Sequence, residues 1–213
     1  ATIPLPTALN RLRLRIVLES DPFVTNEGIA VDDIHIYDNV LGIYEGPPFT
    51  SPVINQPAVT GTNWLNFVWG GKLVASINPN GQNLGNTNVQ AFIHTGAVRN
   101  NGEQYYHNRN ITIKPAGINL ADSATVRFYF LDAETEALIA ATGCVVCTKP
   151  TMVTELGVSK FSTADALENG TIADNTGGTW SFTIPSFVRK IPFDKGYYAE
   201  FNVKDFSEFW LND

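Results

Sequence analysis

The chain has 213 residues, 44% of them hydrophobic, which is enough to form one large core or two modest ones. Its formal net charge of −7 makes nucleic acid and anionic bilayers unfavourable partners, because both carry negative charge. No stretch approaches the roughly 20 apolar residues that cross a bilayer, so we expect no membrane insertion. Only 16% of the residues are charged, while 17 glycines and 12 prolines interrupt the chain, and this balance favours short strands joined by tight turns.

Residues 1–45 are predicted to contain the terminal strands of a jelly-roll-like module. Between residues 11 and 18, leucine and isoleucine alternate with arginine and valine, which is typical of a strand with one apolar face. A turn-rich segment follows over 20–28, and a second strand is expected over 29–37.

Acidic residues cluster here: Asp21 and Glu27 lie in the turn, Asp32 and Asp33 lie in the second strand, and Glu19 joins them from the end of the first. Carboxylates beside a flexible turn suit Ca²⁺, which takes roughly six to eight oxygen ligands in tolerant geometry. The alternative is that these acids are solvated or paired with the arginines of the first strand. A calcium site and a solvated acidic turn therefore both stay open.

Residues 46–63 contain Pro47, Pro48, Pro52 and Pro57 and show no sustained periodicity. Such a segment is typical of an extended connector between two units. We therefore predict a domain boundary there, followed by a larger β-sandwich domain over residues 64–213.

The clearest local signal of this second domain is a hairpin. Two strand-like runs, 64–69 and 72–77, flank Gly70 and Gly71, and a two-residue glycine loop satisfies a primed turn that needs positive φ. A short helix or an ordered loop is expected within 151–168. Further strands are expected over 89–94, 104–106, 110–114, 125–131, 137–142, 180–184, 196–203 and 206–211. With no amphipathic helices between them, these strands predict an all-β fold, an antiparallel β-sandwich of the jelly-roll or immunoglobulin-like type.

The two cysteines, Cys144 and Cys147, are separated by two residues. A local disulfide is the favoured interpretation, and free thiols, a redox pair or a zinc site are the alternatives. A disulfide would favour an oxidising, extracytoplasmic location.

Aromatic residues are numerous for a chain so low in charge. Strand alternation places Trp69 on one face with Phe67, and Trp180 on one face with Phe182, so both tryptophans are expected in the core. Trp64, Tyr105 and Tyr106 are freer. They are the candidates for an exposed carbohydrate-binding platform, although core and edge packing is the more usual role of such rings.

Recognisable catalytic motifs are missing from the sequence. It contains no HExxH zinc pair, no Gly-x-Ser-x-Gly nucleophile elbow and no second CxxC pair. We therefore expect a module without catalytic residues of its own.

Two regions resemble known secreted proteins. Residues 11–38, with the run Glu27-Gly28-Ile29-Ala30-Val31-Asp32-Asp33-Ile34, resemble the last strands of the MAM-like or cleaved-adhesin jelly-roll modules of secreted Bacteroidota proteins. Residues 64–213 resemble the region that follows such modules in surface proteins and proteases exported by the type IX secretion route; the matching stretches are 64–85, 105–110, 126–134, 196–201 and 206–210.

The resemblance implies a secreted or cell-surface location and other domains in a larger parent chain. It also implies a cation ligand at Asp32, which matches the ligand position of the closing Asp-Asp run. Only two or three strands precede the connector, whereas a whole jelly roll needs roughly eight, so most of that module is missing.

Three functions follow as hypotheses. The first is a non-catalytic β-sandwich module with an adhesion, spacer or ligand-presenting role. The second is a carbohydrate-binding module that binds polysaccharide through Trp64, Tyr105 and Tyr106. The third is the accessory C-terminal domain of a secreted metalloprotease or another hydrolase, by analogy alone.

Overall fold

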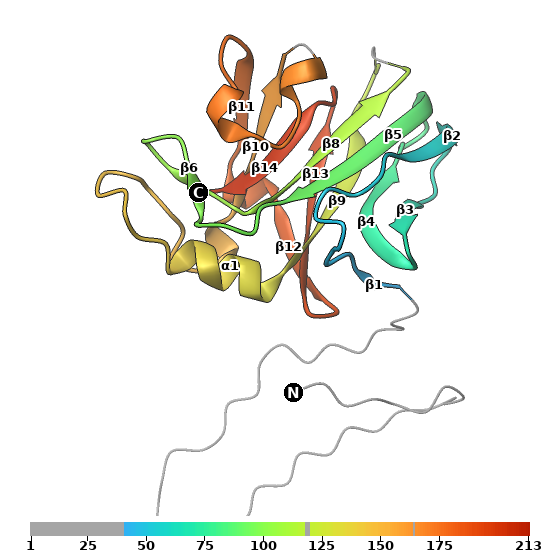
Figure 1. Cartoon of the computed structure of the whole chain (residues 1–213). Coiled ribbons are helices and arrows are strands. Elements are labelled where there is room, and N and C mark those ends of the chain that lie inside the picture. Colours follow the sequence, from blue (N-terminus) through green and yellow to red (C-terminus); the bar gives the residue numbers. More distant parts are fainter. Residues whose placement is uncertain (1–40, 118–119, 164) are drawn as a thin grey trace, which may run out of the picture. The chain divides into compact units, whose positions relative to one another are not determined.

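The computed structural model describes residues 41–117, 120–163 and 165–213, which lie in one compact unit, His35–Asp213. Two six-stranded sheets pack against each other (Figure 1), which confirms the predicted all-β sandwich. Sheet A has the order β1 (Gly42–Ile43), β4 (Lys72–Asn78), β9 (Ala124–Leu131), β13 (Gly196–Val203) and β12 (Arg189–Phe193), with β3 (Leu65–Trp69) paired to β4. Sheet B has the order β11 (Thr179–Thr183), β10 (Gly157–Ser162), β14 (Glu208–Asn212), β8 (Arg109–Pro115), β5 (Asn83–Ile93) and β2 (Ile54–Thr60).

Smaller elements connect and cover these sheets. Strands β6 (Arg99–Asn100) and β7 (Tyr105–Tyr106) form a short antiparallel pair. The α-helix α1 (Asp132–Ile139) directly follows β9. Four single turns of 3₁₀ helix complete the fold: Val153–Glu155, Asp165–Leu167, Ile172–Asp174 and Pro185–Phe187.

The core lies between the inner faces of the two sheets. Val126 and Phe128 of β9 belong to the same buried cluster as Ile111 of β8. Across the core, the rings of Phe201 in β13 and Phe209 in β14 lie 5.5 Å apart. Burying each large apolar side chain contributes about 1.5–3 kcal/mol, so this two-sided apolar layer stabilises the sandwich.

The predicted hairpin over 64–77 is confirmed. β3 and β4 pair antiparallel on either side of Gly70 and Gly71, which have φ values of 55° and 74°. These values lie in the left-handed region that a primed turn requires and that glycine adopts without steric cost.

The predicted connector over 46–63 is wrong in its central part. Residues 54–60 form β2, an edge strand of sheet B that pairs with β5. Residues 42–43 form β1, which pairs in parallel with β4, so they belong to the sandwich as well. The proline at position 57 is tolerated because an edge strand has one row of backbone groups outside the ladder.

One other element prediction is wrong, and one is confirmed only in part. The strand expected over 137–142 does not form, because residues 137–139 are the end of α1 and residues 140–142 follow it. The first turn of α1 holds Asp132 and Glu134, which are favoured there by the positive end of the helix dipole. The segment 151–168 contains two short 3₁₀ helices, Val153–Glu155 and Asp165–Leu167, as expected, but between them it also contains β10, which lies between β11 and β14. Its six residues are too few for a clear period in the sequence.

Trp69 and Trp180 are not core residues, contrary to expectation. Trp69 is 42% exposed because it ends β3, an edge strand, immediately before the Gly70–Gly71 turn. Trp180 is 37% exposed and lies on β11, the edge strand of sheet B. Alternation correctly groups Trp180 with Phe182, but it cannot tell an inner face from an outer one. The strands predicted over 11–18 and 29–37 and the candidate cation ligands Asp21, Glu27, Asp32 and Asp33 lie outside the described residues.

Candidate functional site

The outer face of sheet B is a layer of aromatic and polar side chains. The strand register places Phe182, Ser159 and Trp210 side by side on this face, and it places Trp180 beside Phe161 one pleat further along. Inward-facing neighbours on the same strands belong to the apolar core: Val158, Phe209 and Leu211. Sheet B therefore presents a second layer of packed side chains on its outer side.

Four rings of this layer contact one another. The Tyr106 ring of β7 lies 5.8 Å from the ring of Trp210 and 5.8 Å from that of Trp180, and the Trp180 ring lies 4.9 Å from that of Phe161. Tyr106, Trp210 and Phe161 are buried, whereas Trp180 keeps more than a third of its surface in solvent. The cluster therefore fixes Trp180 from beneath and leaves one part of its ring accessible.

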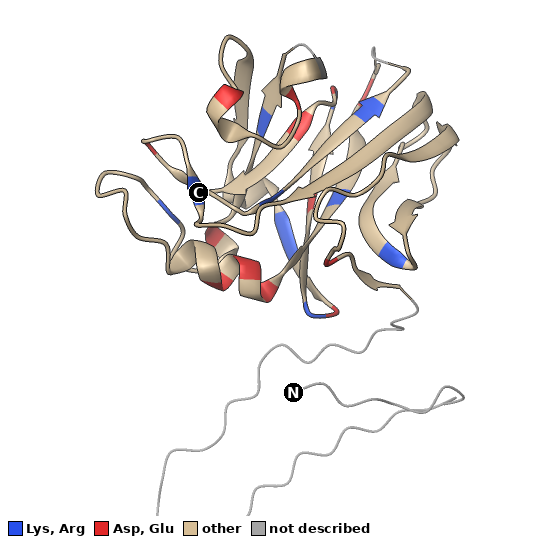
Figure 2. Cartoon of the chain, viewed as in Figure 1, with Lys and Arg blue, Asp and Glu red and all other residues tan. Residues whose placement is uncertain are grey.

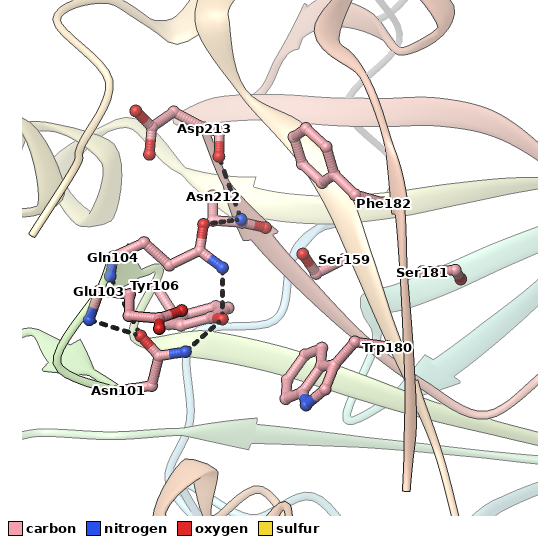
Figure 3. A pocket seen from close by; sticks show the side chains of 10 residues that line it. All are labelled: Asn101, Glu103, Gln104, Tyr106, Ser159, Trp180, Ser181, Phe182, Asn212 and Asp213. Carbon is pink, nitrogen blue, oxygen red and sulfur yellow. Dashed lines mark hydrogen bonds between the residues drawn. The ribbon is translucent and has the colours of Figure 1, made fainter.

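A hollow of about 370 Å³ lies beside Trp180 (Figure 3). We call it the Trp180 hollow. Figure 3 shows residues of the β6–β7 hairpin on one side, β11 on the other and the end of β14 between them. The lining consists of Asn101, Glu103, Gln104, Tyr106, Ser159, Trp180, Ser181, Phe182, Asn212 and Asp213.

Phe182 is positioned over the hollow by a glycine on the neighbouring strand. A Cβ atom at Gly157 would lie 2.5 Å from the Phe182 ring, so only glycine lets the ring approach so closely. Phe182 is 44% exposed, and Trp180 lies two residues before it on the same face. The hollow therefore has a wall with two accessible aromatic rings.

Side-chain amides form the opposite wall. Asn101 and Gln104 donate hydrogen bonds to the Tyr106 hydroxyl, and the Nδ2 group of Asn212 donates to Gln104 Oε1 at 2.8 Å. Asn212 is 1% exposed, and its Oδ1 atom has no hydrogen-bond partner among the described residues. A buried acceptor without a partner costs free energy unless a ligand or water satisfies it.

Charged side chains in the lining are acidic. Glu103 and Asp213 line the Trp180 hollow, and in the described part of the chain no lysine or arginine does so. Burial raises the pKa of the Tyr106 hydroxyl, so it stays neutral. An anionic ligand would therefore be repelled, while a neutral polar ligand would find both hydrogen-bond donors and acceptors.

A buried polar network lies next to the Trp180 hollow on the outer face of sheet B. Glu208 of β14 accepts hydrogen bonds from Asn110 Nδ2 at 2.9 Å, Gly170 N at 2.7 Å and Asn175 Nδ2 at 2.8 Å. Arg99 of β6 lies over the Trp210 ring, 4.3 Å from its centroid. These contacts tie the β6–β7 hairpin and the segment around Gly170 to sheet B.

The predicted carbohydrate platform does not form from the residues expected. Tyr105 is 2% exposed, and its hydroxyl accepts a hydrogen bond from the Cys144 amide at 2.6 Å. Tyr106 is 1% exposed and forms the floor of the Trp180 hollow rather than an open face. Trp64 is half-buried next to sheet A, where Arg127 of β9 lies 3.7 Å from its ring centroid. The three rings thus have three different surroundings.

Sequence reasoning missed most of the residues that surround Tyr106. The pattern predicts Trp180 in the core, on the face that it shares with Phe182, and the amides of Asn101, Gln104 and Asn212 carry no motif. Their juxtaposition depends on β7, β11 and β14 meeting on one face of sheet B, which only the strand order reveals.

Other candidate chemistry is limited in the described part. Cys144 and Cys147 are joined by a disulfide. No group of three or more His, Cys, Asp or Glu side chains that could hold a metal ion occurs among the described residues. Within the same residues, no helix has both the length and the apolar character needed to cross a membrane.

Comparison with known proteins gives no family assignment. No protein-family model matches the sequence, and no curated protein sequence matches it. Function is therefore inferred from the site itself, because a β-sandwich fold alone is compatible with many functions.

Proposed function

We propose that the chain is a non-catalytic β-sandwich module of a secreted or cell-surface protein, and that it binds neutral carbohydrate in the Trp180 hollow. The observation that carries this proposal is the pairing of two accessible rings, Trp180 and Phe182, with a wall of amides in which Asn212 Oδ1 has no hydrogen-bond partner among the described residues. Carbohydrate binding is thus assigned to the residues of the Trp180 hollow instead of to Trp64 and Tyr105.

The chemistry of a sugar ring matches these two walls. One face of a pyranose is a sheet of C–H groups, which packs against an aromatic ring as an apolar surface. Its hydroxyl groups both donate and accept hydrogen bonds, and amide side chains such as those of Asn101, Gln104 and Asn212 do the same. A sugar stacked on Trp180 would therefore have its hydroxyls directed at the amide wall.

The acidic lining favours a neutral glycan over an anionic one. Glu103 and Asp213 are the charged groups of the described lining, and a carboxylate can accept hydrogen bonds from the hydroxyls of a ligand. Carboxylates on a uronic-acid polymer would be repelled by these two side chains. We therefore place neutral polysaccharide ahead of charged polysaccharide as the ligand.

A secreted or cell-surface location is supported by the disulfide. Disulfides persist in oxidising compartments and are rare where thiols are kept reduced. The pair Cys144–Cys147 closes the segment after α1, and the Cys144 amide is tied to the buried Tyr105 hydroxyl. In a larger parent protein, the module would serve as an adhesive or accessory domain that holds the other domains near a glycan.

The test measures binding of soluble neutral polysaccharides, such as β-glucan, mannan and xylan, with alginate as the anionic comparison. Isothermal titration and quenching of tryptophan fluorescence report binding to the full chain. Trp180→Ala is expected to weaken binding at least about tenfold, because it removes the stacking surface.

Trp69→Ala is the matched control, because Trp69 is also a surface tryptophan, 42% exposed, but lies on β3 of sheet A. It should bind like the unmodified chain. Equal loss in both variants, or silence of the unmodified chain on a glycan array, would reject the glycan proposal. Turnover in a glycosidase, esterase or peptidase screen would reject the proposal that the module is non-catalytic.

A further inference from the structure

The outer edge of β11 lacks the features that protect the other edges of the sandwich. An unpaired edge strand is a template for another strand, and proteins block it with charge, proline or a bulge. β12 carries Arg189, Lys190 and Pro192, and Figure 2 shows its basic residues. β2 contains a proline and two register shifts, and the pairing of β3 contains one.

β11 has none of these protections. Its five residues, Thr179–Thr183, include no charge and no proline, and they pair with β10 in an unbroken register. Residues 179–182 are all exposed. The strand therefore presents a regular, uncharged edge with an accessible aromatic face.

The sequence of β11 is also chemically symmetric about its central residue. It reads Thr-Trp-Ser-Phe-Thr, so each residue type has a counterpart at the same distance from Ser181. In an antiparallel pair of two such strands centred on Ser181, Thr179 would face Thr183 and Trp180 would face Phe182 of the other copy. Each aromatic ring would then have an aromatic cross-strand partner, a favourable pairing on a sheet surface.

We propose that β11 pairs antiparallel with β11 of a second copy of this chain, about a two-fold axis through Ser181. A two-fold axis gives a self-complementary contact, which is the commonest arrangement in homo-oligomers. Because β11 carries no charged residue, the pairing places no like charges directly opposite each other across the axis. The apolar surface extends past the end of β11 through Ile184 and Phe187, which are 47% and 72% exposed.

This pairing does not require carbohydrate binding, but it involves Trp180 and Phe182 of the proposed sugar site and has a geometric consequence for that site. Strands added edge to edge continue one sheet, so the outer faces of sheet B of both copies would lie on the same side. The Trp180 hollows of the two copies would then open on the same side of the dimer, where both could contact one glycan surface.

The first test measures the mass of the full chain in solution by light scattering and sedimentation at increasing concentration. The unmodified chain is expected to approach twice the monomer mass. Ser181→Lys is expected to weaken this association at least about tenfold, because it sets two ammonium groups opposite each other at the axis. Thr60→Lys, which places the same charge on the exposed end of β2, should leave the association unchanged.

The second test does not depend on the stability of the lysine variant. Directly opposed residues of an antiparallel pair lie about 4.5–5.5 Å apart, within the Cα separation that a disulfide spans. Ser181→Cys should therefore form a covalent dimer on mild oxidation, and Thr60→Cys should not. A chain that stays monomeric up to millimolar concentration, or a dimer that Ser181→Lys leaves intact, would overturn the proposal. Covalent dimers of both cysteine variants in equal yield would overturn it as well.

Discussion

Arg109 and Glu134 form a buried ion pair where α1 begins. Arg109 Nε and Glu134 Oε2 lie 2.9 Å apart, and the two side chains are only 1% and 13% exposed. Glu134 Oε2 also accepts a hydrogen bond from the Leu131 amide at 2.9 Å, at the N-terminal end of the helix. Burial alone would raise the pKa of Glu134, but Arg109 and then His107 hold it below its usual value. One carboxylate therefore joins β8 to the start of α1.

His107 lies beside this pair and is fully buried. Its Nδ1 atom accepts a hydrogen bond from the Arg109 amide at 3.4 Å, its Nε2 atom lies 3.4 Å from Thr135 Oγ1, and its ring packs edge-on against Phe130. Burial lowers its pKa to about 4, because Glu134 offsets the desolvation and the repulsion by Arg109 and Arg99 only in part. The folded protein therefore holds His107 neutral at pH values where an unfolded chain would protonate it.

This shift gives a pH dependence of stability with a definite sign. Because the pKa of His107 is lower in the folded state than its ordinary value of 6.5, the unfolded state binds more protons between these two values. The free energy of unfolding should therefore fall as the pH falls, with a contribution from His107 of about 2 kcal/mol between about pH 7 and about pH 5. Urea unfolding at a series of pH values measures it.

His107→Asn should flatten this part of the stability profile whatever its effect on absolute stability. His94→Asn is the control, because His94 is an exposed residue at the end of β5 and should keep most of the slope. A profile of equal slope in His107→Asn and in the unmodified chain would show that the buried imidazole is not the group responsible.

At the scale of elements, the β3–β4 hairpin shows how local chemistry selects a turn. A Cβ atom at Gly70 would meet nothing within 4 Å, so a substitution there tests backbone conformation without changing packing. Gly70 has a φ of 55°, in the left-handed region that asparagine tolerates and β-branched residues avoid.

Gly70→Asn is therefore expected to change the free energy of unfolding by less than about 0.5 kcal/mol, because asparagine adopts the left-handed region readily. Gly70→Val should lower it by about 1–2 kcal/mol. Denaturant unfolding of the two variants side by side gives the comparison. Equal stability of both would mean that the turn relaxes to another conformation.

The sequence predicted elements well where a local rule decides them. Turn glycines and period-two alternation predicted the bounds of β9 and β13 to within one residue. They also predicted the β3–β4 hairpin and its two-glycine turn. The same rules placed a strand over the second half of α1, where acidic residues near the helix start were the overlooked signal (Figure 2 shows these residues on α1). They also missed β10, because a six-residue strand with mixed side chains has no distinctive period.

At the scale of the whole molecule, the calcium site stays a prediction. If Asp21, Glu27, Asp32 and Asp33 bind Ca²⁺ in the folded state only, the ion shifts the folding equilibrium and raises the melting temperature of the full chain. Calorimetry in calcium and in EDTA should therefore give a higher melting temperature with calcium, and Asp32→Asn should reduce the difference. The same melting temperature in both buffers would leave the acidic turn as a solvated segment.

The sequence by itself determined the class of the fold and the hairpin turn and favoured the Cys144–Cys147 disulfide, because alternation, positive-φ glycines and a two-residue spacing act over a few neighbouring residues. It did not determine which face of a strand lies inside. Trp180 and Phe182 share one face in the sequence pattern, but their exposure depends on β11 being the edge of sheet B. Only the tertiary structure decided that these rings, Tyr106 and Asn212 surround one hollow, because strands far apart in the chain bring them together.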